Sequence, residues 1–349
     1  MLQTEKFKMQ INKQLLNQML KEKYVQMQKH PEADLFIYNY TRNAEYNKVW
    51  NEVTLQTRGL ILDSEMNIVA LPLRKFFNDF ETKEENIPNL PFEVYEKMDG
   101  IMGIIYFLND KPYVASRGSF NSKFANKANE MLYGKYSHVI DKLDKTKTYI
   151  VEIIYPEAKI VVDYNGKEEL VLLAIIDTET GLDLPLEDIG FPVVKKYDGI
   201  KDINILRQLE EENKEGFIVK FSNGFRMKVK FKEYFRLHQI ITQVSSITIW
   251  EHLSQNRPLD ELLDNVPDEF YEWVKKTSNE LLNKFNSIMD EVNEKYYHII
   301  DRKEFSKIIE KDKYKGFLFT RLNSYSQDLN RQIWDTIRPE FSKPFLNGH

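Results

Sequence analysis

A lysine followed closely by an acidic residue and a glycine is the sharpest chemical signal in the sequence. The segment Glu96-Lys97-Met98-Asp99-Gly100 overlaps the end of an apolar run that predicts a strand over 92–98. A lysine amine becomes a nucleophile when burial or neighbouring cations favour its neutral form, and a glycine lets a phosphate approach the backbone closely. Taken alone, the stretch from Lys97 to Gly100 is more typical of a β-turn with a solvated lysine. Its meaning therefore depends on the rest of the sequence.

Two glutamates stand next to or within strongly apolar runs. Glu152 lies inside Tyr149–Ile154, where strand alternation places it on the same face as Ile150 and Ile154. A buried carboxylate needs a partner, which a cation or a ribose hydroxyl can provide, whereas an outward-facing edge position would leave it solvated. Glu215 directly precedes a glycine and another apolar run. Both positions are candidates for a polar site.

A basic hairpin follows the second glutamate. The turn residues Asn223-Gly224 separate two apolar runs and predict a hairpin, whose second arm carries Lys228-Val229-Lys230. Alternation places the two lysines on one face, where they repel each other unless an anion lies nearby; a solvated sheet face is the competing interpretation. From 214 to 236 there are seven basic and two acidic residues, although the whole chain has a net charge of −5. This local excess favours a phosphate-binding surface.

The elements that position these residues change in type along the chain. Apolar residues at helical spacing predict a helix over 5–28. Short apolar runs between turn signals predict strands from 34 to 235, including one over 160–164, with a helix around 121–144. After about 240 only helices are predicted, the longest of them starting at Pro267-Asp268-Glu269. The predicted C-terminal helices are 270–299, 303–312 and 323–337.

Composition excludes several classes of chemistry. The 349 residues include no cysteine, which rules out disulfides, zinc–thiolate sites and thiol nucleophiles. The glycine-rich phosphate-binding motif with a terminal Gly-Lys-Ser/Thr is absent, and the six histidines are scattered, with His238 expected to be structural. No run approaches the ~20 apolar residues of a membrane helix. We therefore expect no membrane association and a cytoplasmic location.

The order and spacing of these elements resemble the covalent nucleotidyltransferase superfamily of ATP-dependent ligases and capping enzymes. Five further segments resemble the phage RNA ligase 1 family, and the likeness extends over about 34–240. They are Phe36–Tyr40, Thr57–Leu60, Arg74–Asn78, Ser116–Ser119 and Pro156–Tyr164. The resemblance implies an α+β fold with an antiparallel two-sheet nucleotidyltransferase core. Residues 1–240 would form the adenylyltransferase domain, and 241–349 an all-helical C-terminal domain.

The resemblance also implies a reaction. Lys97 would attack the α-phosphate of ATP and hold AMP as a phosphoramidate; the AMP then passes to an RNA 5′-phosphate, and an RNA 3′-OH finally displaces it. Each step is an in-line displacement, so catalysis consists mainly of positioning and charge stabilisation. RNA ends would be the substrates, with a nicked tRNA among the candidates and RNA repair as the role, and we expect a monomer.

Roles for individual residues follow from the resemblance. Lys228 and Lys230 would contact the α-phosphate, and Arg58 and Lys75 the outer phosphates or the RNA 5′-phosphate. Glu152 and Glu215 would serve the ribose and a hydrated Mg²⁺, for which Mn²⁺ could substitute, because magnesium keeps several waters and needs few protein ligands. Leu173 and Ile218 would sandwich the adenine, whose edge the backbone around Glu96 would read. Arg117 stands where the family often has lysine and keeps the charge.

Two alternatives remain open. A DNA ligase or a capping-type nucleotidyltransferase would share the lysine chemistry, but these enzymes usually carry an OB-fold after the strand with the paired lysines, and the helical pattern after 240 disfavours that. A catalytically inactive RNA-binding relative is the other alternative. The intact set of Lys97, Glu152, Glu215, Lys228 and Lys230 disfavours it.

Overall fold

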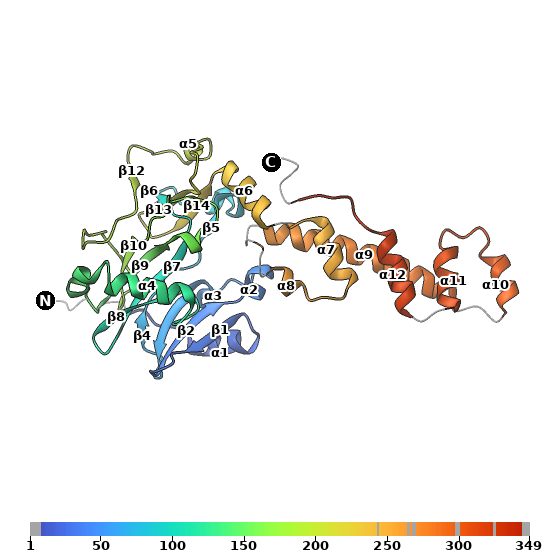
Figure 1. Cartoon of the computed structure of the whole chain (residues 1–349), viewed down its shortest axis with the longest axis horizontal. Helices are drawn as coiled ribbons and strands as arrows, with labels where there is room; N and C mark the ends of the chain where they lie inside the picture. The colour runs from blue at the N-terminus through green and yellow to red at the C-terminus, as the bar shows by residue number, and fades with distance from the viewer. Residues whose placement is uncertain are drawn as a thin grey trace. The chain divides into compact units, whose positions relative to one another are not determined.

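The computed structural model describes residues 8–242, 244–263, 266, 270–296, 301–323 and 326–343. It divides the chain into two compact units, Met1–His238 and Gln239–His349, whereas the sequence analysis places the boundary at 240. The strands labelled in Figure 1 lie in the first unit, and the described elements of the second unit are helices. The observed architecture is therefore mixed α and β with a helical C-terminal region.

The first sheet forms the N-terminal part of the first unit. Its strands run in the order β1-β2-β3-β4 with antiparallel pairing throughout. Their bounds are β1 Val25–Lys29, β2 Leu35–Tyr40, β3 Arg58–Asp63 and β4 Ile68–Ala70, and the accompanying helices are α1 Lys13–Lys21, α2 Arg42–Tyr46 and α3 Glu52–Gln56. Apolar side chains of β2 and β3, among them Ile37, Leu60 and Ile61, are fully buried and make this sheet part of the main core.

Two further sheets carry most of the polar residues identified above. One has the order β11-β10-β9-β7-β8 and is antiparallel; the other has the order β12-β6-β13-β14-β5, in which only the β14–β5 pair is parallel. The strands of the former are β7 Ile101–Leu108, β8 Lys111–Ser116, β9 Lys147–Ile154, β10 Glu169–Asp177 and β11 Asp183–Leu184. The strands of the latter are β5 Phe77–Asn78, β6 Phe92–Lys97, β12 Lys196–Tyr197, β13 Gly216–Phe221 and β14 Arg226–Lys230.

Three differences from the sequence predictions concern this unit. The described residues form three sheets, whereas the resemblance implied a core of two. The predicted helix over 5–28 is too long: within the described residues α1 ends at Lys21, Lys23 adopts a positive φ of 61°, and Val25–Lys29 pairs with β2 instead. The stretch 160–164 is no strand. Two backbone amides of this stretch donate instead to the buried carboxylate of Asp99.

Helices of the first unit complete its cores. The predicted helix around 121–144 is split into α4, Lys123–Tyr133, and a 3-10 helix at Ser137–Lys142, with α4 beginning at the Ser122 N-cap and ending at Gly134. A short helix, α5, spans Ile203–Leu206. Helix α4 packs on β8 and buries its apolar face in the core beneath the second sheet.

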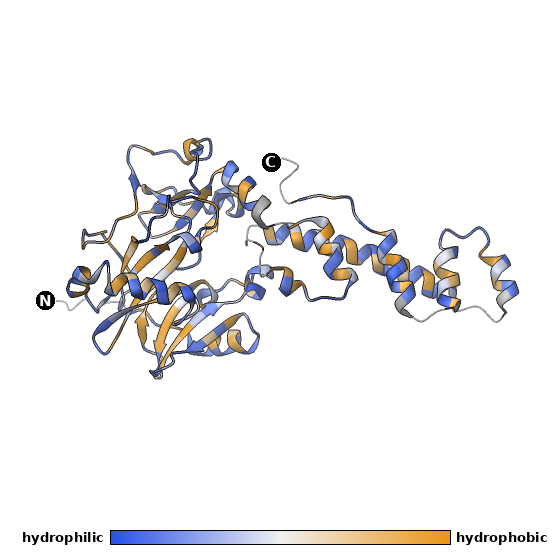
Figure 2. Cartoon of the chain, viewed as in Figure 1, coloured by the Kyte–Doolittle hydropathy of each residue, from blue (hydrophilic) through white to orange (hydrophobic). Residues whose placement is uncertain are grey.

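The second unit has a core of its own. Its elements are the end of α6 (Lys232–Thr242), α7 Ser246–Ser254, α8 Leu259–Leu263, α9 Tyr271–Tyr296, α10 Arg302–Ile308, α11 Lys315–Asn323 and α12 Ser326–Thr336. Helix α9 carries hydrophilic and hydrophobic residues along its whole length in Figure 2, as a helix with one apolar stripe does. Phe305, Leu318 and Ile333 are buried in this core.

The C-terminal helix predictions agree with the structure in type but not in every boundary. Helices α9, α10 and α12 fall on the three predicted segments, whereas α7, α8 and α11 were not predicted. The predicted helix start at Pro267-Asp268-Glu269 lies outside the described residues. None of the helices in the described part of the chain combines the length and apolar character that crossing a membrane needs.

Candidate active site

A cavity of about 930 Å³ opens in the first unit, lined by residues from all three sheets. Eight of the residues singled out from the sequence line it: Arg58, Glu96, Lys97, Arg117, Glu152, Leu173, Ile218 and Lys228. They lie on or beside β3, β6, β8, β9, β10, β13 and β14. The fold therefore brings together side chains that lie as much as 170 positions apart in the chain.

Strand register explains how Glu215 reaches two lysines at once. Gly216, the first residue of β13, is paired with Lys97 on β6 and with Lys230 on β14. Glu215 immediately precedes it, and its Oε2 lies 2.6 Å from the Lys97 Nζ while its Oε1 lies 3.0 Å from the Lys230 Nζ. Gly216 has a φ of +146°, and a Cβ there would lie 2.1 Å from the Val229 carbonyl oxygen, so the bridge requires glycine at this position.

The charges of this bridge are buried. The side chains of Glu215 and Lys230 are 4% and 6% exposed, whereas that of Lys97 is 18% exposed and faces the cavity. Burial by itself raises the pKa of the Glu215 carboxyl, but Lys97 and Lys230 together outweigh it and hold that pKa below its ordinary value. Glu215 is thus a fixed carboxylate that orients the Lys97 amine.

Glu152 is a second buried carboxylate with different surroundings. It lies in the middle of β9, paired with Met102 on β7 and Val171 on β10, as the predicted apolar face requires. Its carboxylate forms no ion pair with a cation of the described residues. Desolvation therefore raises its pKa to about 8, although Lys97 and Arg58 act in the opposite direction. A cation entering the cavity would convert it to the charged form.

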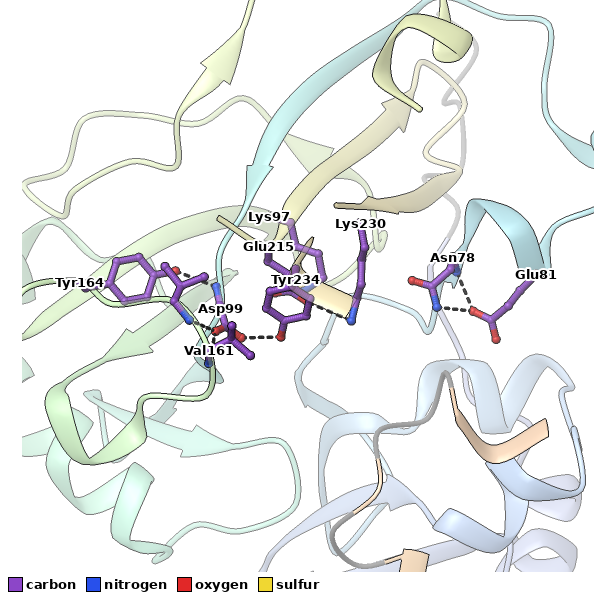
Figure 3. Close-up of polar contacts among 10 residues, drawn as sticks. Asn78, Glu81, Lys97, Asp99, Val161, Tyr164, Glu215, Lys230 and Tyr234 are labelled. Carbon is purple, nitrogen blue, oxygen red and sulfur yellow. Dashed lines mark hydrogen bonds and ion pairs between the residues drawn. The ribbon is translucent and has the colours of Figure 1, made fainter. Parts of the chain in front are cut away.

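A third carboxylate, Asp99, fixes the backbone just after Lys97. Its Oδ2 accepts from the amides of Val161 and Val162 at 2.8 and 2.7 Å, and its Oδ1 accepts from the Tyr234 hydroxyl at 2.8 Å. The Asp99 amide donates in turn to the Tyr164 hydroxyl at 2.8 Å. Figure 3 shows Asp99 between the two tyrosines. This network replaces strand pairing for the 160–164 stretch and anchors the turn that follows the nucleophile candidate.

The surroundings of Asp99 disfavour its charged form. Asp99 is 2% exposed, and burial, together with the negative charge of Glu215, raises the pKa of its carboxyl despite three hydrogen-bond donors. Tyr234 also places its ring 5.1 Å from the Lys230 ammonium. The tyrosine therefore connects Asp99 with the lysine on the far side of Glu215.

Cationic side chains surround the rest of the cavity. The Arg58 guanidinium and the Lys228 ammonium lie 5.7 and 5.6 Å from the centre of the Phe76 ring, and Arg58 also donates to the Met102 sulfur at 3.1 Å. Arg117 lies on the turn after β8, where its Nη1 donates to the Tyr40 hydroxyl at 3.3 Å. These positive charges give the cavity the electrostatic character of a polyphosphate site.

The apolar part of the cavity lies on the neighbouring strands. Leu173 sits at an irregularity in the pairing of β10 with β9, between Leu172 and Ala174, and Ile218 projects from β13 on the same face as Lys220. Both line the cavity, as an aliphatic base sandwich would require. The amide of Glu96, whose surrounding backbone was expected to read a base edge, donates to the Lys195 carbonyl at 2.8 Å.

Lys75 is the one predicted site residue placed elsewhere. It is buried, forms an ion pair with Glu45 of α2, and has the rings of Tyr40, Trp50 and Phe77 within 5.3 to 5.5 Å of its ammonium. It lines a second cavity rather than the one beside Lys97. A local pattern could not have shown this, because Glu45 precedes Lys75 by 30 positions.

Sequence reasoning assigned no role to several residues that shape the site. Asp99 belongs to the motif around Lys97 and could have been singled out, whereas Tyr164 lay within a recognised segment without a function. Phe76 likewise lay within a recognised segment, and Tyr234 gave no signal of its own, since an aromatic residue within a helix is usually part of the core. Their roles depend on contacts with distant residues.

Comparison with known proteins identifies the family. A model of the RNA ligase family matches residues 56–235, which is more than half of the 349 residues. The chain belongs to the RNA ligase family. This confirms the predicted likeness to RNA ligases and the predicted enzyme class, and it favours an RNA ligase over the DNA-ligase and capping-enzyme alternatives.

Two curated relatives are named as RNA ligases. The RNA ligase of Rhodothermus phage RM378 is 22% identical over 348 residues, covering 75% of this chain and 78% of that protein. A putative bifunctional polynucleotide kinase/RNA ligase of Autographa californica nuclear polyhedrosis virus is 25% identical over 274 residues, covering 70% of this chain. The latter match spans 39% of the viral protein's length.

Overall similarity to solved structures is low. A Naegleria gruberi RNA ligase has a TM-score of 0.37 at 21% identity, over 44% of this chain and about half (52%) of that chain. A putative ATP-dependent DNA ligase from Aquifex aeolicus has a TM-score of 0.43 at 15% identity and covers 80% of both chains.

Proposed function

We propose that the protein is an ATP-dependent RNA ligase that joins 5′-phosphate and 3′-OH ends through a lysyl-AMP intermediate on Lys97. The observation that carries the proposal is the position of the Lys97 amine. It faces a 930 Å³ cavity, is held at 2.6 Å by the buried Glu215, and has Arg58, Arg117 and Lys228 on the surrounding walls. A nucleophile fixed among phosphate-binding cations is what adenylyl transfer requires.

The reaction consists of three displacements at phosphorus. The neutral Lys97 amine attacks the α-phosphate of ATP, the bond to the bridging oxygen breaks, pyrophosphate leaves, and the amine loses a proton to solvent. An oxygen of the RNA 5′-phosphate then attacks the AMP phosphorus, and the lysine leaves and regains a proton. Finally the RNA 3′-OH attacks the 5′-phosphate, AMP leaves, and the hydroxyl proton passes to solvent.

Most of the predicted residues around Lys97 have a task in this scheme. Lys228, on the cavity wall, would neutralise charge at the α-phosphate, and Lys230 would act from behind Glu215 by balancing its charge. Arg58 and Arg117 would bind the outer phosphates or the RNA 5′-phosphate with their planar donors. Leu173 and Ile218 would enclose the adenine.

The donor set also fits a hydrated divalent cation. Within the described residues no group of three or more acidic or histidine side chains converges as a metal site. Magnesium, with manganese as a substitute, would therefore be held largely by water and phosphate, with Glu152 as the protein carboxylate exposed to it. Glu215, both of whose oxygens engage lysines, would reach it only through water. The ion would reduce the negative charge of the phosphates.

The same proposal assigns adenylyl transfer to the first unit. Every residue given a nucleotide contact lies before His238, so the helical C-terminal unit would contribute to RNA recognition rather than to the chemistry. RNA ends are the proposed substrates, a nicked tRNA is one candidate among them, and repair of broken RNA is the proposed role.

A labelling experiment tests the proposal. The full chain is incubated with Mg²⁺ and ATP labelled at the α-phosphate, and then with a 5′-phosphorylated single-stranded RNA. We expect a covalent AMP adduct and, afterwards, a sealed RNA. An adduct formed from GTP instead would indicate a capping-type enzyme, and the absence of any adduct would indicate an inactive RNA-binding relative.

A further inference from the structure

A second cavity adjoins the one that contains Lys97. It measures about 1090 Å³, and six of its lining residues also line the first cavity. The shared residues are Leu73, Phe76, Glu93, Asp183, Lys220 and Arg226. Phe76 and Phe77 follow each other at this boundary: Phe76 approaches the cations of the first cavity, whereas Phe77 lines only the second. The two cavities are thus neighbouring parts of one recess.

One face of the β13–β14 hairpin runs along both cavities. Its cross-strand pairs are Gly216 with Lys230, then Ile218 with Lys228, then Lys220 with Arg226. The intervening Phe217, Val219, Met227 and Val229 are buried on the opposite face, so the cations share one face by strand alternation. Cationic side chains therefore continue from the Glu215 bridge outward to the second cavity, where Arg226 is paired with Asp183 and Lys220 lies opposite Glu93 of β6.

Beyond Lys220 and Arg226, the second cavity is lined by a further cation and three aromatic rings. Arg74 is exposed, lines the second cavity alone, and forms no ion pair with a described residue. Phe77, Phe92 and Phe225 are half-buried there, each supported by another ring: Phe77 by Trp50 at 5.4 Å, and Phe92 and Phe225 by Phe221 at 5.5 and 5.6 Å. A cationic groove with half-exposed aromatic rings is the pattern that binds single-stranded nucleic acid.

We propose that this second cavity binds the single-stranded RNA segment next to the end being joined. Arg74 and Lys220 would contact its backbone phosphates, and the Phe225 ring would stack on a base. The inference rests on the proposed ligase function, because only a ligase needs an RNA strand to reach the nucleotide in the first cavity. Arg226 is held by a bidentate ion pair with Asp183, at 2.5 and 2.9 Å, and would fix the wall between the cavities.

Binding of short RNAs to the full chain, measured without ATP by fluorescence anisotropy at several salt concentrations, tests this site. One probe carries a 5′-phosphate and a blocked 3′ end, and another a free 3′-OH and no phosphate, so that the two strands of the break are distinguished. The variants are Arg74→Ala and Phe225→Ala. Their matched controls are Lys111→Ala, at an exposed lysine of β8, and Tyr133→Ala, at a half-exposed ring of α4, neither of which lines either of these two cavities.

We expect Arg74→Ala to lower the slope of log K against log salt by about 0.7, the loss of one phosphate contact to a single strand. Phe225→Ala should weaken binding about 10-fold, and Phe225→Tyr, which keeps the ring, should restore it. The probe that loses affinity identifies the strand. Neither variant should change the adenylylation of Lys97, because Arg74 and Phe225 do not line the first cavity.

Three results separate the possibilities. Unchanged binding of both probes in folded Arg74→Ala and Phe225→Ala proteins would overturn the proposed RNA site. A higher ATP requirement for adenylylation in Arg74→Ala would overturn it as well, since the cavity would then serve the triphosphate. Failure of the unmodified protein to become adenylylated would contradict the proposed function alone, because RNA binding is read independently of ATP.

Discussion

Two glutamates that interact with Lys97 have opposite electrostatic surroundings. Glu215 lies between two ammonium groups, at 2.6 and 3.0 Å, and its carboxyl pKa is lowered in spite of burial. Glu152 is embedded in β9 without a direct ion pair, and its pKa is raised to about 8. The two residues are of the same type and are both buried. The difference between their pKa values therefore comes from the lysines that the strand register places beside Glu215 but not beside Glu152.

This difference suggests a division of labour. A charged Glu215 orients the nucleophile, because the ion pair with Lys230 compensates its charge both before and after Lys97 reacts. Glu152 is close to neutral at physiological pH and becomes charged when a cation arrives. The former is a fixed structural charge and the latter a charge that responds to ligand.

The largest effect is expected when Lys97, which interacts with both glutamates, is removed. Lys97→Ala should abolish the covalent AMP adduct while leaving the fold intact, since it removes the amine that forms the bond to AMP. Gel detection of labelled adduct, with Lys111→Ala as the control, measures this, and a melting curve verifies folding. An adduct that forms at the normal rate in Lys97→Ala would show that the nucleophile is a different residue.

Removing Glu215 or Lys230, the other two members of the ion-pair bridge with Lys97, should have the next largest effect. Glu215→Ala and Lys230→Ala should each slow adenylylation by about 10²-fold or more, the scale of losing one preorganised electrostatic contribution to a transition state, because each removes part of the ion pair that orients the Lys97 amine. Rapid-quench measurement of adduct formation at saturating ATP separates this loss from weaker ATP binding. Near-normal rates in both variants would contradict the arrangement proposed for the pocket.

A smaller effect is expected at Asp99, the third buried carboxylate. Tyr234→Phe removes the hydroxyl that donates to Asp99 at 2.8 Å but keeps the ring beside Lys230. A hydrogen bond to a charged group contributes about 1.5–3 kcal/mol, so the free energy of unfolding should fall by about that amount. Urea titration provides the measurement. If Tyr234→Phe is as stable as the unmodified protein, the Asp99 network does not anchor the turn after Lys97.

The most subtle test compares the pH dependence of the two glutamates. The pKa of Glu152 rises from 4.5 to about 8 on folding, so its contribution to stability is complete below about pH 4.5 and is lost as pH rises towards 8. Glu215 has a lowered pKa, so its contribution is present above its ordinary pKa and is lost as pH falls.

Melting temperatures of Glu152→Gln and Glu215→Gln, recorded from acid to mildly alkaline pH, should therefore diverge. Glu152→Gln should lose the fall in stability between about pH 5 and pH 8, and Glu215→Gln should lose part of the fall on the acid side. Parallel curves for the two variants would mean that the two carboxylates do not differ as the geometry indicates.

The amino-acid sequence determined many of the local elements of this protein and most of its candidate site residues. Alternation located β13 and β14 and their turn, which the structure confirms as an antiparallel hairpin, and it placed Lys228 and Lys230 on one face and Glu152 within an apolar strand. These features depend on neighbouring residues along one strand, whose side-chain period is fixed by the backbone itself.

Only the tertiary structure decided which of these residues meet. Gly216 stands between β6 and β14, which lets Glu215 hold two lysines, whereas Lys75 is taken by Glu45 and an aromatic cluster away from the Lys97 cavity. The stretch 160–164 has the composition of a strand but is bound by the Asp99 carboxylate instead. Strand pairing and buried ion pairs join residues far apart in the chain, and a periodic pattern carries no information about the partner, which is fixed by register and by the need to compensate buried charge.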